Sequence, residues 1–179
     1  DLYLFSKAAF FIGDTSGIVQ LYNLFSNPVI GVNSITLTHN TNDLRGWIDA
    51  MEATTPERDL MIFDKFYDKR NDRYLTFRDM LEYETEGYGA TYLSPAPHMF
   101  SLYEKLEIVP IKNTSEEIFE VTKEMWERLN GIAEYTAEDI ELQNKFLNIK
   151  REYEGRGNIF RPYRIGRDFL RKNKWLLDG

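Results

Sequence analysis

Five small and polar residues, Gly13-Asp14-Thr15-Ser16-Gly17, separate an apolar run from a stretch with helical spacing. This order is typical of a strand that ends in a turn and leads into a helix. A helix start presents unpaired backbone N–H groups and the positive end of the helix dipole, so an anion is favoured there. Gly17 would let a ligand approach the backbone, while Thr15 and Ser16 would add hydroxyl donors. The turn therefore predicts a site for a phosphate or diphosphate.

Other interpretations of this turn imply different chemistry. No Gly-Lys-Ser/Thr follows it, which excludes a Walker A loop, and the dinucleotide fingerprint Gly-x-Gly-x-x-Gly is absent. Its Gly-x-Thr-x-Gly pattern has the outline of a nucleophile elbow, with Thr in place of Ser. That chemistry needs a histidine base, and the chain has only His39 and His98. The simplest alternative is that the polar residues of the turn only cap the helix.

The elements around the turn predict a parallel sheet. A helix over 17–25 would bury one apolar stripe, and the next run, Pro28 to Val32, is apolar on both alternating sets. Such a run is typical of a strand that is covered on both faces. Strands at 10–13 and 28–32 should therefore be adjacent and parallel, joined by a right-handed crossover. The expected fold class is α/β, a Rossmann-like open, mainly parallel sheet flanked by helices.

Residues 2–8 have the pattern of a helix end, and residues 34–58 form a long polar excursion of the kind that is often functional. The apolar runs 60–63 and 106–111 predict two further strands. The length of 179 residues fits one domain over 1–179.

Capping signals predict three helices in the rest of the chain. Thr76, Thr114 and Thr136 are each followed three residues later by an acid, and the helices that they start should run to about 84, 131 and 155. The second of these helices should bury one stripe and end at Gly131. The members of this stripe are Ile118, Val121, Met125 and Leu129. Residues 136–179 are expected to form a carboxyl-terminal helical extension.

The composition excludes several classes of protein. A net charge of −7 disfavours a nucleic-acid binder, which would need a basic surface. The absence of cysteine excludes disulfides, thiolate zinc sites and cysteine nucleophiles. No apolar run approaches the ~20 residues of a membrane span. Asp68, Asp72 and Asp79 fit positions 1, 5 and 12 of a calcium loop, but arginines stand at positions 3 and 6, which favours a solvated turn before a capped helix.

The segment FFIGDTSGIVQLYNLFSNPVIGVN, residues 10–33, resembles the donor-site segment of GT-B glycosyltransferases. The nearest likeness is to a bacterial family of surface-polysaccharide glycosyltransferases, and heptosyltransferases are more distantly similar. The first likeness extends to DLYLFSKAAFFIG at the start, DKRNDRYLTFRDMLE at 68–82, LEIVPIKNTSEEIFEVTKEM at 106–125 and RIGRDFLRKNKWLL at 164–177. Unlike the heptosyltransferases, this chain has Ser16 between Thr15 and Gly17 and lacks the histidine that follows their turn.

The resemblance implies one half of a GT-B fold, which binds a nucleotide-sugar donor, while an amino-terminal half binds the acceptor. Gly13, Asp14, Thr15, Ser16 and Gly17 would face the donor diphosphate and sugar. No metal or other cofactor is implied, the catalytic residues stay unknown, and the isolated half should be inactive. The alternatives are a non-catalytic nucleotide- or phosphate-binding module, and an interaction domain whose turn only caps a helix.

Two further residues are candidates for contacts with the sugar or the base. Asn33 ends the second strand and His39 follows it, so both should lie at the carboxyl edge of the sheet. A lone histidine in a polar loop usually has no such role, and the same holds for His98.

The start of the chain, DLYLFSKAAF, reads as a cut inside a longer protein, with a processed terminus as the alternative. Apolar surface is expected at residues 2–5 and near Trp175, where a missing domain or a second copy would bind. The basic tail, 151–174, should pair within the chain with the acidic helix 138–154; the alternatives are a donor diphosphate and anionic lipid. A cytoplasmic enzyme, peripheral to the membrane, would fit these expectations.

Overall fold

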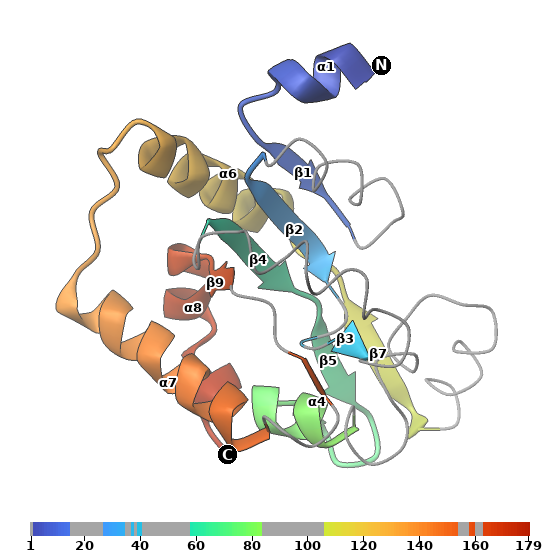
Figure 1. The fold of residues 1–179 in the computed structure, drawn as a ribbon. Coiled ribbons are helices and arrows are strands. Elements are labelled where there is room, and N and C mark those ends of the chain that lie inside the picture. The colour runs from blue at the N-terminus through green and yellow to red at the C-terminus, as the bar shows by residue number, and fades with distance from the viewer. Residues whose placement is uncertain are drawn as a thin grey trace.

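The computed structural model describes residues 2–14, 27–34, 37, 39–40, 58–83, 106–153, 158–159 and 163–179. Its centre is a parallel sheet in the order β1-β2-β4-β9 (Figure 1). The strands are β1 (Phe11–Gly13), β2 (Val29–Ser34), β4 (Asp59–Phe63) and β9 (Tyr163–Ile165). Helices flank this sheet, so the fold is α/β with a Rossmann-like open, mainly parallel sheet, as the sequence predicts.

The first two strands confirm the predicted parallel pair. Phe11 lies opposite Val29 and Gly13 lies opposite Gly31, so the ends of both strands point the same way. The helix that was expected over 17–25 lies outside the described residues. The predicted strand at 60–63 is also confirmed, as β4, which pairs in parallel with β2.

The fourth strand, β9, is a feature that the sequence analysis missed. Its three residues pair in parallel with β4, with Ile165 opposite Met61. Residues 136–179 therefore contribute a strand to the central sheet in addition to helices. A run of three residues with Arg164 in the middle has too little apolar periodicity to be recognised as a strand.

A second, antiparallel sheet continues from the carboxyl end of β4 in the order β6-β5-β7 (Figure 1). Its strands are β5 (Lys65–Asp68), β6 (Arg73–Tyr74) and β7 (Ile108–Ile111). The last was predicted, whereas the charged hairpin β5-β6 was not. A short antiparallel pair, β3 (His39–Asn40) with β8 (Asn158–Ile159), completes the described strands.

The described helices are α1 (Leu2–Lys7), α4 (Phe77–Tyr83), α6 (Ser115–Leu129), α7 (Ala137–Tyr153), α8 (Arg167–Lys172) and the 3-10 turn η3 (Lys174–Leu177). All three predicted caps are confirmed, since Thr76, Thr114 and Thr136 each accept a hydrogen bond from the backbone of the acid three residues later. In turn, the backbone N–H of each threonine donates to the carboxylate of that acid, so both N–H groups have a partner.

Helix α6 lies against β2 and β4 and buries only part of the predicted stripe. Val121 and Met125 are buried and Ile118 is partly buried, but Leu129 is 47% exposed, so the prediction for Leu129 is wrong. Leu129 occupies the last turn, which extends past the packed region. The helix ends as predicted, with Gly131 at a φ of +69°.

An aromatic cluster fills the core between the sheet, α4 and α7. The ring of Phe63 lies 5.9 Å from those of Phe77 and Tyr163, and Phe146 of α7 lies 5.0 Å from Phe77. All four rings are buried. The cluster joins the end of β4 to α4, α7 and β9, and thereby fixes the position of that strand end.

Large apolar side chains are exposed at the start of the chain and beside Trp175 near its end. Leu2, Tyr3 and Leu4 are 59–71% exposed, which agrees with the expectation for the start of the chain. Trp175 is partly buried and packs against the core, and its ring lies 5.0 Å from that of Tyr74. Tyr74 is 45% exposed, so apolar surface is also present near Trp175.

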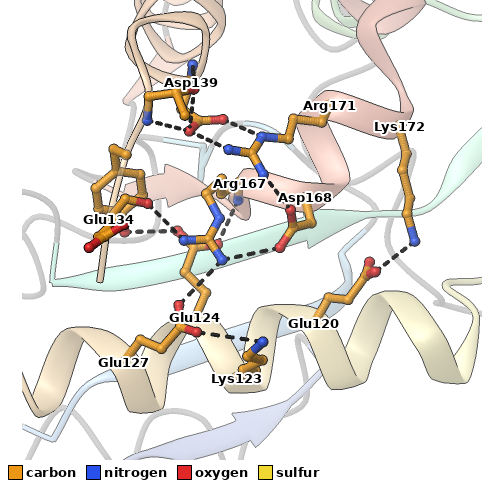
Figure 2. Close-up of polar contacts among 12 residues, drawn as sticks. Glu120, Lys123, Glu124, Glu127, Glu134, Asp139, Arg167, Asp168, Arg171 and Lys172 are labelled. Carbon is orange, nitrogen blue, oxygen red and sulfur yellow. Dashed lines mark hydrogen bonds and ion pairs between the residues drawn. The ribbon is translucent and has the colours of Figure 1, made fainter. Parts of the chain in front are cut away.

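The basic tail pairs within the chain, as expected, but its partners lie on two helices. Arg171 bonds Asp139 at the start of α7, and Lys174 bonds Glu138 beside it. Figure 2 shows that the tail also reaches α6, where Lys172 pairs with Glu120 and Arg167 contacts Glu127. These ion pairs hold α8 between α6 and α7 (Figure 1).

Candidate ligand site at the carboxyl edge of the sheet

The carboxyl ends of β1, β2 and β4 are adjacent because the three strands are parallel neighbours. In open α/β sheets ligands bind outside this edge. Gly13 is the last residue of β1 and Asp14, which is exposed, follows it, so the start of the predicted turn lies at this edge. Thr15, Ser16 and Gly17 lie outside the described residues.

Asn33 holds a left-handed backbone, with a φ of 49°, at the carboxyl end of β2. The backbone N–H of Asn33 donates to Oδ1 of Asn113 at 2.6 Å, and the N–H of Asn113 donates to Oδ1 of Asn33 at 2.9 Å. The amide of Asn113 also donates to the carbonyl of Phe63 at 2.8 Å. Asn33 was predicted as a ligand contact, and the structure shows that its side-chain oxygen is bound within the protein.

Asp64 follows the last residue of β4 and is fully buried. Its Oδ2 accepts a 2.7 Å hydrogen bond from Nζ of Lys112, whose side chain is 63% exposed. Burial raises the pKa of Asp64 and outweighs the opposing effects of Lys112 and Lys65. The ion pair thus joins a fully buried carboxylate to a lysine side chain that is largely exposed to solvent.

A second ion pair lies beside the first. Lys65, one residue after Asp64, donates to Glu117 at 2.6 Å, and both side chains are largely buried. Burial alone would raise the pKa of Glu117, but hydrogen bonds from Lys65 and the backbone of Thr114 lower it. Two cations and two carboxylates therefore balance at the junction of β4, β7 and α6.

The structure also locates the other sequence candidates. His39 lies in β3 opposite Ile159 of β8, and His98 lies outside the described residues. The acids of the calcium-loop template are bound by protein donors: Asp68 accepts from Asn71 and the backbone of Arg70, and Asp79 accepts from Arg73. This matches the interpretation as a turn before a capped helix.

Asp64, Lys112 and Asn113 are the residues that the sequence analysis missed. Asp64 was detectable in principle, because it is the polar residue that directly follows an apolar strand, just as Asp14 follows the first strand. Lys112 and Asn113 come immediately before a capping box, where polar residues have a simple local explanation. Only the fold brings these three residues to one place.

Among the described residues, no three histidine, cysteine, aspartate or glutamate side chains are grouped so that they could hold a metal ion. The described helices are all too short or too polar to span a bilayer. The chain matches no protein-family model, no curated protein and no solved structure.

Proposed function

We propose that this chain is the donor-binding half of a GT-B-like glycosyltransferase that acts in bacterial surface-glycan assembly. The observation that carries the proposal is the parallel pair β1-β2, which brings Gly13-Asp14 to the same edge as Asn33 and Asp64. That edge is the usual ligand position in open α/β sheets. The donor diphosphate would contact the turn at residues 13–17, and the sugar would lie toward the ends of β2 and β4.

The reaction would transfer a sugar from the nucleotide diphosphate to an acceptor hydroxyl. The hydroxyl oxygen forms a bond to the anomeric carbon, the bond from that carbon to the diphosphate breaks, the diphosphate leaves with the electron pair, and the hydroxyl proton is released to solvent. Backbone N–H groups and hydroxyls of the turn would stabilise the charge that develops on the leaving group. The proposal includes a cytoplasmic location at the inner face of the membrane and an acceptor site on an amino-terminal domain.

The test is the effect of nucleoside diphosphates on thermal stability. A ligand present at ~100 times its dissociation constant should stabilise the fold by roughly 2.7 kcal/mol. UDP, GDP, ADP and dTDP are the probes, with inorganic sulfate at equal ionic strength as the control for nonspecific anion binding. Stabilisation by one nucleotide and not by sulfate supports the proposal. A melting temperature that no nucleotide raises beyond sulfate would overturn it.

A further inference from the structure

Helix α6 carries large apolar side chains on the side that faces solvent. They form a surface that we call the outer patch, which consists of Phe119, Trp126, Leu129 and Ile132. The first three belong to the helix, Ile132 follows its end, and all four are 47–68% exposed. Phe119 and Trp126 are two turns apart and therefore lie on the same side of the helix. Val121 and Met125 point the other way, into the core.

The size of the outer patch marks it as an interaction surface. A buried aromatic side chain contributes about 150–250 Å² of contact area, so four large side chains that are about half exposed leave roughly 400 Å² of apolar surface in one place. Contiguous apolar patches of a few hundred Å² on a single chain are often sites of association. The outer patch therefore calls for a partner, and the residues around it indicate which kind.

The charges of α6 disfavour an anionic membrane surface as this partner. A helix that binds such a membrane carries mainly basic residues beside its apolar side. In α6 the acids outnumber the bases, with Glu116, Glu117, Glu120, Glu124 and Glu127 against Lys123 and Arg128. The whole chain has a net charge of −7 as well. A protein surface is therefore the better fit.

The order of the residues makes the outer patch complementary to itself. Phe119 and Ile132 are equally far from a point just before Trp126, and so are Thr122 and Leu129. If two copies of α6 pack antiparallel about this point, Phe119 of each copy lies against Ile132 of the other, and the two Trp126 side chains meet at the axis. Closed two-fold dimers have this property, because each of their contacts occurs twice.

The charges beside the outer patch agree with the same arrangement. Lys123 and Glu127 lie on one flank of the patch, on either side of the axis and almost equally far from it. In an antiparallel pair this flank faces the same flank of the other copy, so each Lys123 lies opposite Glu127 of the other copy. Lys123 is 60% exposed, and its distance of 3.7 Å to Glu127 of its own helix is long for an ion pair. Its ammonium group is thus able to turn toward a second copy.

We infer that the outer patch is the interface of a two-fold dimer, in which α6 packs antiparallel against α6 of a second copy of this chain. The inference does not depend on the proposed function. Interfaces that bury less than ~1,200 Å² in total are typical of weak, reversible complexes, and a single pair of helices belongs to this class. The dimer should therefore be in equilibrium with the monomer and should dissociate on dilution.

Sedimentation equilibrium of the full chain at several concentrations measures the dissociation constant of the dimer. Trp126→Glu places two like charges at the axis and should raise this constant at least ~100-fold, because a central tryptophan contributes strongly to binding and a symmetric dimer loses it twice. Ile140→Glu is the matched control, since Ile140 is 52% exposed on α7, outside the outer patch. It should leave the dissociation constant unchanged.

Cross-linking tests the orientation of the two helices. The chain has no cysteine, so introduced cysteines are the only thiols. A mixture of Phe119→Cys and Ile132→Cys chains should be linked by a short bifunctional thiol reagent, because packed helices lie ~8–10 Å apart. Either variant alone should not be linked, since the two copies of one position would be ~20 Å apart along the helix axis.

The inference is supported if Trp126→Glu dissociates the dimer, Ile140→Glu retains it, and only the mixture of cysteine variants is linked. A chain that is monomeric at every concentration overturns it, and so does a dimer that persists in Trp126→Glu. Monomers that bind phosphatidylglycerol vesicles, and lose this binding in Trp126→Glu, would assign the outer patch to a membrane and also overturn it.

Thermal unfolding excludes an intramolecular role for Trp126. It is measured at a concentration at which the unchanged chain is monomeric, so that dissociation does not affect the melting temperature. Trp126→Glu and Ile140→Glu should then melt at similar temperatures, because both replace an exposed side chain. A Trp126→Glu chain that melts far earlier, or does not fold, would show that Trp126 packs within its own chain, which contradicts the dimer.

Discussion

Asn33 and Asn113 bond each other reciprocally, each side-chain oxygen accepting from the backbone N–H of the other, across 80 residues of sequence. The bond holds the left-handed end of β2 against the junction of β7 and α6. Asn tolerates this backbone better than most residues, because its short polar side chain can bond locally. Lys112 precedes Asn113 directly, so the same junction also places the ammonium over Asp64.

The first prediction concerns this pair. Asn113→Ala should lower the free energy of unfolding by about 2–4 kcal/mol, because it leaves the N–H of Asn33 and the carbonyl of Phe63 without their partners in a buried place. Urea denaturation measures the change. Asn130→Ala removes an exposed amide at the end of α6 and should matter far less. Equal effects of the two substitutions would show that the reciprocal pair has no special role.

The second prediction concerns Gly166, which lies between β9 and α8. A Cβ there would lie 3.0 Å from Cγ2 of Ile62 and 3.1 Å from Cγ2 of Val121, both in the packed layer between β4 and α6. Gly166→Val should therefore destabilise the fold by about 1–3 kcal/mol through overpacking. At Gly131 the space is open and only the positive φ opposes a side chain, so Gly131→Ala should lower stability by about 1 kcal/mol and Gly131→Asn by less. Thermal and urea unfolding of all three variants measures the loss of stability. The results compare the cost of added side-chain volume at Gly166 with the cost of backbone strain at Gly131.

The third prediction concerns the dependence of stability on pH. Burial alone would raise the pKa of Asp139, but hydrogen bonds from Arg171 and Thr136 outweigh it and lower the pKa below 3.8. A carboxylate with a lowered folded-state pKa stabilises the fold above its ordinary pKa, and this contribution is lost as the pH falls through the folded-state value. Arg171→Met should therefore destabilise the fold near neutral pH by about 2 kcal/mol, reduced from the fully buried case because Arg171 is 34% exposed.

The difference between Arg171→Met and the unchanged chain should begin to shrink as the pH falls toward 3.8, and it should be lost only below the lowered folded-state pKa of Asp139, where the carboxyl group is protonated in both chains. Urea unfolding at several pH values between 3 and 7 measures it. Lys145→Met breaks the exposed ion pair with Glu141 and is the control. Its free energy of unfolding should stay close to that of the unchanged chain at every pH. A difference for Arg171→Met that stays constant down to pH 3 would contradict the assignment.

The sequence predicted those parts of the fold that depend on local signals. The pair β1-β2 follows from two apolar runs with a short connection, and the three caps follow from a threonine and an acid three residues apart. β9 and the hairpin β5-β6 were missed because tertiary pairing stabilises short strands that have charged residues and no clear periodicity. The contacts of the candidate site join residues 48 and 80 positions apart, and no local pattern encodes such a contact.

The last prediction separates a ligand site from a helix cap at the turn 13–17, of which the structure describes Gly13 and Asp14. If the turn binds a diphosphate, Gly17→Val should abolish nucleotide binding, because the side chain would occupy the space where the phosphate meets the backbone. Ser16→Ala should weaken binding by ~1.5–3 kcal/mol, the value of a hydrogen bond to a charged group. Without ligand, Ser16→Ala should lower stability by only about 1 kcal/mol or less, as for a lost cap. Calorimetry with the nucleotide that stabilises the unchanged chain gives the affinity, and thermal unfolding gives the stability. Variants that melt earlier yet bind that nucleotide as tightly as the unchanged chain would show that the turn only caps its helix.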